Sequence, residues 1–230
     1  MDKKKALTIA ASSKLSNAAH TAVAAADLEP SRLFEFLLPD CKPIAAPSQR
    51  YNSEDKTFIK SEVQRLLDAD IIEPAGSHWR AQVLVVKQGE KKRLVIDYSV
   101  TINRFNLLDA YPLPNMEDLV NRKAHDKYFS SIDLWLAYHQ VPLLAEQRHY
   151  TAFEADGQLF QYKRLPFGVT NGVSDFQCSI NECIKKHRLK KVYAYPVVGL
   201  GLGGPEARLK RGPLMTSPWS ANRDNHVWFA

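Results

Sequence analysis

The stretch YTAFEADGQLFQYKRLPFGVTNGVSDFQ, residues 150–177, contains the signals that decide the fold class. Its first half mixes apolar and polar residues around Asp156-Gly157, a pair that suits both positive-φ positions of a type I′ hairpin turn. After a Pro-Phe-Gly turn at 166–168, apolar residues recur at intervals of three and four, which is the period of a helix. A hairpin followed by an amphipathic helix indicates an α+β protein.

The helix predicted after this turn has suitable signals at both ends. Thr170 or Asn171 can cap its start, and Asp175 lies in its first turn. Basic residues at 185–188 complement the dipole at its end. The apolar stripe of the helix consists of Val173, Phe176, Ile180, Cys183 and Ile184. This stripe predicts that the helix packs against a sheet.

Patterns of the same two kinds, one typical of strands and one typical of helices, recur along the rest of the chain. Ser53 is the expected N-cap of a helix whose apolar face comprises Phe58, Ile59, Val63, Leu66 and Leu67. The other predicted elements are a hairpin of residues 81–88 and 93–99, a short helix that begins near Pro114, and strands at 128–134 and 191–195.

The composition of the 230 residues is that of a globular protein, with 45% hydrophobic residues and a formal net charge of +6. This charge mildly favours a polyanionic partner but does not identify one. Cys41, Cys178 and Cys183 lack Cys-x-x-Cys spacing, so neither a disulfide framework nor a zinc site is expected. Polar residues interrupt the apolar N-terminal stretch, and no run approaches the ~20 residues of a membrane helix. We therefore expect an intracellular protein without a membrane span.

Both ends of the chain differ in composition from its middle. Residues 1–27 are rich in Ala, Ser and Lys without a firm period, and we expect a disordered or loosely attached tail. Residues 196–230 hold 5 of the 10 glycines and 4 of the 13 prolines. Such a segment buries too little apolar surface to offset the entropy of ordering, so we expect a second disordered tail, unrelated to a domain at 28–195. The abrupt change at Pro196 suggests a frameshift, an altered splice or a mispredicted exon, a hypothesis that translation of the underlying DNA in all frames would test.

A single carboxylate stands out in YFSSIDLWLAYHQVPL, residues 128–143. Asp133 follows a run that is typical of a buried strand and precedes a turn. A charge in an apolar setting is costly unless it is paired, protonated or bound to a metal. Asp133 therefore either solvates the end of a strand or belongs to a site, since strand ends often reach a cleft.

Several segments together resemble the reverse transcriptases of gypsy-like LTR retrotransposons in order and spacing. They are RLVIDYSVTINRFNLLDAYPLP (93–114), FSSIDLWLAYHQVPL (129–143), the stretch at 150–177, and KVYAY (191–195). The likeness extends from about Leu28 to Tyr195. It implies the fingers and palm of a right-hand polymerase, with an antiparallel palm sheet packed on helices and without the thumb subdomain.

The resemblance implies template-directed transfer of a nucleotide from a dNTP to a primer 3′-hydroxyl on an RNA or DNA template. Two Mg²⁺ ions, about 3.5–4 Å apart, activate the hydroxyl and stabilise the leaving pyrophosphate in this type of reaction. Asp133 matches the family's first metal-binding aspartate, and the backbone carbonyl of Leu134 would be a supporting ligand.

Five residues match substrate-binding positions of the family, namely Lys87, Arg93, Tyr138, Phe167 and Gly168. Tyr138 matches the aromatic gate under the incoming sugar, and the basic pair matches positions that touch the triphosphate. Phe167 and Gly168 match the start of the motif that shapes the nucleotide pocket. Without the resemblance, these residues would be read as a half-buried tyrosine, a solvated basic face and a turn that leads into a helix. His139 is expected only to pack and to form hydrogen bonds.

The sequence lacks the second half of the metal site. The family places an Asp pair directly after the strand that matches 191–195, whereas this chain has Pro196, Val197 and Val198 there, and no acid before Glu206. Valine cannot bind Mg²⁺, and proline disturbs a strand. Positioning and electrostatics supply nearly all the catalysis of phosphoryl transfer, so we expect a catalytically defective domain.

Three functions therefore remain open: a defective reverse transcriptase domain, a non-catalytic nucleic-acid-binding remnant, and an α+β scaffold without a nucleic-acid role. Primer extension and salt-dependent binding distinguish them. Gly199, Gly201 and Gly204 have the spacing of a dinucleotide-binding loop. Pro205 follows them directly and no βαβ unit surrounds them, so we discount that motif.

Overall fold

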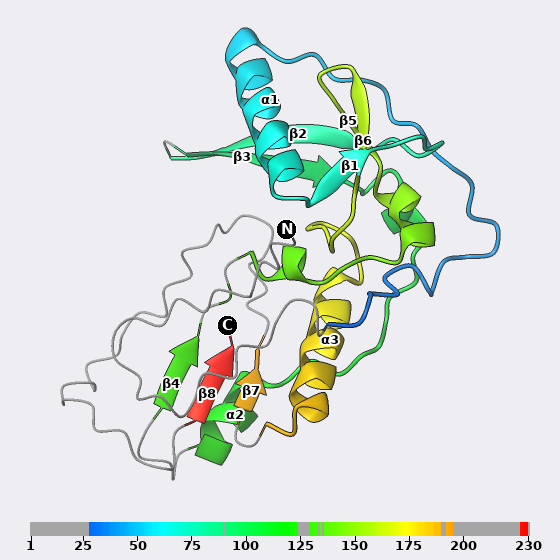
Figure 1. Cartoon of the computed structure of the whole chain (residues 1–230). Coiled ribbons are helices and arrows are strands. Elements are labelled where there is room, and N and C mark those ends of the chain that lie inside the picture. Colours follow the sequence, from blue (N-terminus) through cyan, green and yellow to red (C-terminus); the bar gives the residue numbers. More distant parts are fainter. Residues whose placement is uncertain are drawn as a thin grey trace, which may run out of the picture. The chain divides into compact units, whose positions relative to one another are not determined.

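The computed structural model divides into two compact units, which are drawn in Figure 1. It describes residues 28–89, 91–123, 129–132, 134, 136–189, 192–195 and 226–229. The larger unit contains Leu28–Tyr111 and Leu136–Ser179, and the smaller unit contains the other described residues. Helices and mostly antiparallel strands confirm the α+β class. The tail predicted at 1–27 lies outside the described residues.

Helix α1 (Ser53–Asp68) is capped by Asn52. The backbone of Asn52 is extended, and its side-chain Oδ1 accepts a hydrogen bond of 2.7 Å from the N–H of Asp55. The prediction of Ser53 as the cap is therefore wrong by one residue. Both residue types can cap, but Asn52 is the one whose acceptor reaches a free N–H of the first turn, so the helix begins at Ser53.

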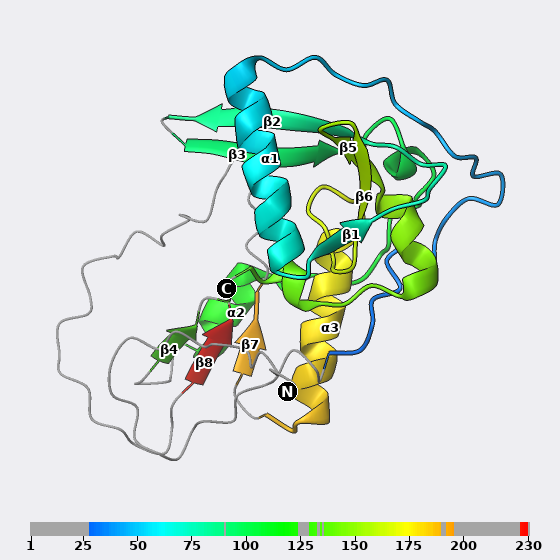
Figure 2. The ribbon, with the colours of Figure 1, turned by 45° about the horizontal axis from the view of Figure 1, so that its top comes forward.

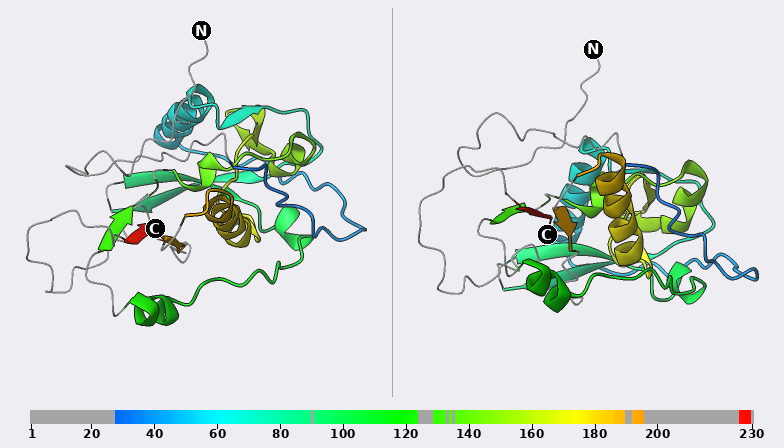
Figure 3. Two further views of the ribbon diagram at one scale, coloured as in Figure 1. Left: turned by 60° about the horizontal axis from the view of Figure 1, so that its bottom comes forward. Right: turned by 90° about the horizontal axis from the view of Figure 1, so that it is seen from below.

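Strands β2 (Gln82–Gln88) and β3 (Lys91–Asp97) form the predicted antiparallel hairpin. Helix α1 lies across one face of this hairpin (Figures 2 and 3). The hydroxyl of Tyr51, just before the helix, donates a hydrogen bond of 2.6 Å to the carbonyl of Val83 in β2. This bond connects the start of α1 to the hairpin.

A second sheet in the larger unit has the strand order β1–β6–β5, with all pairings antiparallel. Its strands are β1 (Ile72–Pro74), β5 (Phe153–Ala155) and β6 (Gln158–Tyr162). Asp156 and Gly157 have φ angles of 51° and 73°, which confirms the predicted turn between β5 and β6. The N–H of Ala81 donates to the carbonyl of Ala152 at 2.8 Å, so the chain that leads into β2 is bonded beside β5.

Apolar side chains from all of these elements form the core of the larger unit. Buried examples are Ile59 of α1, Ile72 of β1, Val83 of β2, Ile96 of β3, Phe153 of β5 and Phe160 of β6. Their burial supplies the main favourable term in folding, since apolar area removed from water stabilises the folded state.

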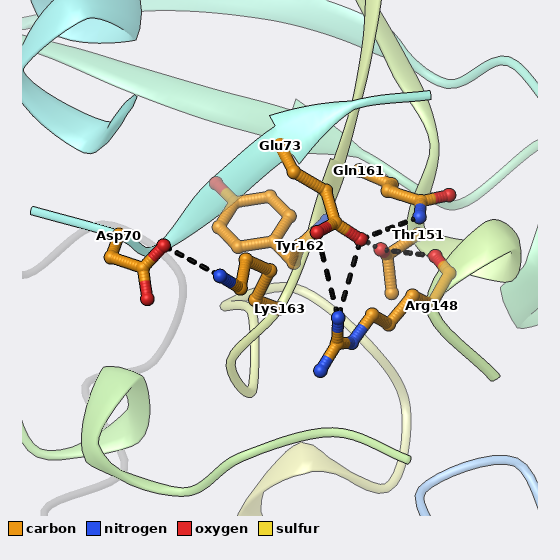
Figure 4. A network of polar contacts seen from close by, with 7 residues as sticks. All are labelled: Asp70, Glu73, Arg148, Thr151, Gln161, Tyr162 and Lys163. Carbon is orange, nitrogen blue, oxygen red and sulfur yellow. Dashed lines mark hydrogen bonds and ion pairs between the residues drawn. The ribbon is translucent and has the colours of Figure 1, made fainter. Parts of the chain in front are cut away.

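A polar network joins β1, β6 and the 3₁₀ helix η4 (Ala145–Thr151), as Figure 4 shows. The Glu73 carboxylate accepts hydrogen bonds from Gln161 at 2.8 Å and from Arg148 at 3.3 Å. The hydroxyl of Thr151 donates to the carbonyl of Arg148 and accepts from the N–H of Tyr162. The Glu73 and Arg148 side chains are only 31% and 23% exposed, so water screens this ion pair less than one at the surface.

Glu73→Ala is expected to lower the free energy of unfolding by about 1–3 kcal/mol, because it leaves the partly buried Arg148 and Gln161 without their shared acceptor. Asp70→Asn is the matched control, because asparagine tolerates the φ of 57° at this position. It removes the charge that pairs with Lys163, where the Asp70 side chain is 66% exposed, and should cost less than about 1 kcal/mol. Denaturant unfolding of both variants measures the difference, and equal losses would contradict this prediction.

The smaller unit contains a parallel sheet with the strand order β4–β8–β7. Its strands are β4 (Phe129–Ile132), β7 (Val192–Ala194) and β8 (His226–Phe229). This sheet differs from the antiparallel palm sheet that we expected, and β8 lies within the segment that we expected to be without structure. The physical reason is that residues 195–225 separate β7 from β8, and a connection of that length permits parallel pairing whereas a tight hairpin does not.

Helix α3 (Gly172–Lys186) begins where the sequence predicts and extends from the larger unit into the smaller one. Phe176, Ile180 and Cys183 of its predicted stripe are buried. Helix α2 (Met116–Lys123) belongs to the smaller unit. Over the described ranges, no helix combines the length and the apolar character that crossing a membrane requires.

Candidate functional site

Three aromatic rings from separate elements meet around Tyr138 in the larger unit. Tyr138 begins the 3₁₀ helix η3 (Tyr138–Gln140). Its ring centre lies 4.9 Å from that of Phe176 in α3, with an angle of 12° between the planes, and 4.6 Å from that of Phe167. Burial raises the pKa of the Tyr138 hydroxyl to about 12, so the hydroxyl is neutral near pH 7. Two of the predicted substrate-binding residues, Tyr138 and Phe167, are therefore in contact.

Gly168 holds the next position of this loop against strand β3. Its φ is +87°, and a Cβ placed on it would lie 3.2 Å from the carbonyl oxygen of Ile96 and 3.7 Å from the ring of Tyr98. Glycine alone combines this backbone conformation with so close an approach at little cost. The adjacent Phe167 is 54% exposed, so the loop presents an aromatic ring beside bare backbone.

His139 contacts the same loop on the N-terminal side of Phe167. Its Nδ1 lies 3.1 Å from the carbonyl oxygen of Leu165. A carbonyl can only accept, so Nδ1 carries the proton. The His139 ring also stacks on Tyr162 and meets Phe167 edge to face, with centroid distances of 5.8 and 5.3 Å. Burial lowers the pKa of His139 from 6.5 to about 4, so a neutral imidazole packs here.

Acidification is expected to destabilise the protein through His139. Between pH 6.5 and about 4 the unfolded chain binds a proton at this residue and the folded chain does not, so the free energy of unfolding falls as the pH falls. The full loss is about 3 kcal/mol. Urea unfolding at a series of pH values measures it.

His139→Gln is the control for this pH dependence, because glutamine can donate to the Leu165 carbonyl but does not titrate. Its unfolding free energy should vary less with pH over the same window than that of the unsubstituted chain. Identical pH profiles for the two proteins would contradict the prediction.

The hairpin register separates the two basic residues that we expected to share the triphosphate. Lys87 pairs with Lys92, and Val86 pairs with Arg93. Paired residues share a face of a sheet and successive residues alternate between faces. Lys87 and Arg93 therefore leave the hairpin from opposite faces.

Helix α1 covers the face that carries Lys87 and Lys92. The Nζ of Lys92 lies 2.6 Å from the Glu54 carboxylate and 2.7 Å from the Asp55 carboxylate, both in the first turn of α1. The hydrogen bonds from Lys92 are the main cause of the lowered pKa of the Glu54 and Asp55 carboxyls, and the charge of Lys87 lowers both pKa values further. Arg93 lies on the other face, two residues from Val95, which is 39% exposed.

The structure describes only one of the two predicted metal ligands. Asp133 is outside the described residues, and Leu134 is a partly exposed residue of the smaller unit. Across the described ranges, no group of three or more His, Cys, Asp or Glu residues could hold a metal ion. The sequence has Pro196, Val197 and Val198 where paired aspartates are expected. This donor set does not fit two Mg²⁺ ions, which require oxygen ligands in near-octahedral geometry.

Sequence reasoning missed Asn103 and considered Asn171 only as a possible helix cap. The side chain of Asn103 forms hydrogen bonds with the backbone of Gly168 and Thr170, and the side chain of Asn171, just after this loop, forms them with the backbone of Leu107 and Asp109. No local pattern marks these residues, because their partners lie more than 60 residues away in the chain. Both asparagines fall within segments that resemble the family, which is the one signal that could have directed attention to them.

Comparison with known proteins gives consistent matches. Residues 76–196 match the family model described as reverse transcriptase (RNA-dependent DNA polymerase). The chain is 33% identical over 150 residues to the retrovirus-related Pol polyprotein from transposon 412, and 33% identical over 145 residues to that from transposon gypsy, both of Drosophila melanogaster. These alignments cover 62% and 60% of this chain but 12% and 14% of the relatives, so the chain spans a small part of the length of the polyproteins it matches.

Solved structures with a similar fold include two of a foamy viral protease-reverse transcriptase, one in complex with double-stranded DNA and one with an RNA/DNA hybrid. The TM-score is 0.56 for both, with sequence identities of 19% and 18%. The matches cover 69% and 68% of this chain, and 27% and 21% of the viral chains. At this identity, the likeness shows a shared fold.

Proposed function

Because the chain belongs to the reverse transcriptase (RNA-dependent DNA polymerase) family and its relatives include gypsy-type Pol polyproteins, we propose that it binds a primer–template and dNTPs but is defective in nucleotide transfer. The foamy viral relatives were solved with DNA and with an RNA/DNA hybrid, which supports a nucleic-acid duplex as the partner. The net charge of +6 is compatible with such a polyanion.

The arrangement of Tyr138, Phe167 and Gly168 is the observation that carries this proposal. The exposed ring of Phe167 rests on Tyr138, and the backbone beside it is bare at Gly168. Aromatic faces stack on nucleobases, and the glycine at 168 lets the loop that carries Phe167 lie directly against β3. In the proposed complex, Tyr138 lies under the incoming sugar, and Phe167 and Gly168 shape the nucleotide pocket.

Arg93 is the proposed principal contact of the hairpin with phosphate and base. It lies on the face away from α1, and a guanidinium is planar and always charged, which suits both phosphate pairing and base stacking. Lys87 lies on the α1 side, close enough to Glu54 and Asp55 to lower the pKa of both. These carboxylates weaken its attraction for a phosphate, so we assign Lys87 a secondary contact.

The proposed defect follows from the chemistry of the donor set. Bound Mg²⁺ would activate the primer hydroxyl and stabilise the leaving pyrophosphate. Asp133, with the carbonyl of Leu134, is the part of the ligand set that the sequence retains, and Val197 and Val198 offer no side-chain oxygen. Without the other carboxylates, this chain cannot hold two cations and a triphosphate in line.

Titration of a fluorescent primer–template with the full chain at several salt concentrations tests the proposed binding. The logarithm of the binding constant should fall linearly with the logarithm of salt concentration, because bound phosphates release counterions. Arg93→Ala should weaken binding and reduce the magnitude of the slope by about 1. Lys60→Ala removes the same charge from an exposed position on α1 and should leave the slope nearly unchanged.

Absence of salt-dependent binding would overturn this proposal and favour the reading of an α+β scaffold without a nucleic-acid role. Equal effects of Arg93→Ala and Lys60→Ala would show that binding reflects total charge, and would remove the specific role of the open hairpin face.

A further inference from the structure

The loop that carries Phe167 and Gly168 is held on both sides by hydrogen bonds from elsewhere in the larger unit. On the N-terminal side, the N–H of Leu165 donates to the carbonyl of Val141 at 2.9 Å, and His139 donates to the carbonyl of Leu165. On the C-terminal side, the side chain of Asn103 provides the contact. Phe167 therefore projects from a short segment with two anchored ends.

Asn103 forms two hydrogen bonds with the loop at the same time. Its Nδ2 donates to the carbonyl of Gly168 at 2.8 Å, and its Oδ1 accepts from the N–H of Thr170 at 3.0 Å. A side-chain amide offers a donor and an acceptor side by side, so it can bind two backbone groups that are two residues apart. Aspartate can replace only the acceptor, and alanine can replace neither.

The segment that presents Asn103 is itself fixed. Asn103 lies in the 3₁₀ helix η2 (Ile102–Arg104), where Ile102 is fully buried. The backbone N–H of Asn103 donates to the carbonyl of Tyr98. Further along the same segment, the Nδ2 of the buried Asn171 donates to the carbonyl of Leu107 at 2.8 Å. A side chain on so constrained a segment can set the position of a loop, because it has little freedom to follow the loop.

We propose that Asn103 is a positioning residue that fixes the loop 166–170, so that Phe167 and Gly168 are held in the conformation in which they receive the primer–template and nucleotide. This role rests on the proposed function of the loop. Asn103 itself contributes through backbone bonds and not through charge, so its loss should weaken binding without altering the dependence on salt.

The test compares Asn103→Ala with Asn52→Ala in the full chain. Each variant removes one asparagine whose Oδ1 accepts a hydrogen bond from a backbone N–H in the larger unit, but Asn52 caps α1 and its side-chain bond goes to Asp55, outside the loop. Hydrogen exchange reports on the loop, and titration of a fluorescent primer–template reports on binding. Asn103→Ala should accelerate exchange at 166–170 and weaken binding by roughly three- to tenfold with an unchanged salt slope, since it removes two hydrogen bonds that are partly exposed to water.

Two further variants separate positioning from general stability. Asn103→Asp keeps the acceptor for Thr170 and should show intermediate exchange and affinity. Gly168→Ala displaces the same loop directly, through its positive φ and the contact with Ile96, and should resemble Asn103→Ala. The control Asn52→Ala should lower stability without changing loop exchange or affinity.

The inference is overturned if Asn103→Ala and Asn52→Ala leave exchange at 166–170 and affinity equally unchanged. If the unsubstituted chain binds no primer–template, the proposed function fails, but the exchange measurement still tests whether Asn103 positions the loop. Faster hydrogen exchange in Asn103→Ala that is confined to 166–170 then supports the positioning role, and unchanged exchange refutes it.

Discussion

Primer extension by this chain in Mg²⁺ is expected to be at least about 10³-fold slower than by a reverse transcriptase that carries paired aspartates after the strand matching 191–195. Loss of a single electrostatic contact to a transition state already costs about 10²–10³ in rate. Here two carboxylates are replaced by Val197 and Val198, and the reaction depends almost entirely on the positioning of cations and phosphates. Single-nucleotide incorporation on a labelled primer–template measures the rate.

Asp133→Ala provides the control for this expectation. If the metal site is incomplete, removal of its remaining carboxylate should not lower incorporation further, whereas the salt-dependent affinity for primer–template should persist in both proteins. Incorporation at an ordinary rate that Asp133→Ala abolishes would show that this chain builds a working metal centre from other ligands. That result would refute the proposed defect while retaining the family's chemistry.

Tyr98→Ala is expected to lower the free energy of unfolding by about 3–5 kcal/mol, because it deletes a large buried ring and leaves a cavity. Tyr98 is 1% exposed, and its hydroxyl donates to the carbonyl of Thr151 at 3.0 Å. Its ring also lies next to Gly168, so the cavity would open behind the loop that carries Phe167. Chemical denaturation followed by circular dichroism measures the change.

Tyr98→Phe separates the hydroxyl from the ring. It retains the packing and removes one hydrogen bond, so the expected loss is about 1 kcal/mol. A loss for Tyr98→Phe as large as that for Tyr98→Ala would show that the bond to Thr151, and not the volume of the ring, dominates. A loss below about 1 kcal/mol for Tyr98→Ala would contradict the assignment of Tyr98 to the rigid core.

Local features of the fold were predictable wherever the decisive interactions lie within a few residues. The turn at Asp156-Gly157 requires two positive φ angles, and this residue pair tolerates them, so the hairpin of β5 and β6 follows from the sequence. The start of α3 and the burial of Phe176, Ile180 and Cys183 follow from helical spacing, whereas the burial of the polar Ser174 and Gln177 does not. The one-residue error at Asn52 arose because two adjacent residues can both cap a helix.

The composition of the candidate site was partly predictable, but its geometry was not. Resemblance placed Tyr138, Phe167 and Gly168 at one site, and the structure brings Tyr138 and Phe167 into contact. The resemblance did not reveal that Lys87 and Arg93 lie on opposite faces of the hairpin. A shift of one residue in strand register reverses the face of every side chain, so the faces had to come from the structure. Asp133 lies outside the described residues, so its metal role stays a prediction.

The sequence by itself determined the family, the hairpins and helices, and the absence of an acid at Val197 and Val198, because each of these depends on residue identity or short-range spacing. Tertiary structure alone decided which basic residues face α1, how Asn103 holds the loop at Gly168, and that β8 pairs in parallel with β4 and β7. These features join residues far apart in the chain. Their partners are selected by the packing of the whole unit, and no local pattern in the sequence records that choice.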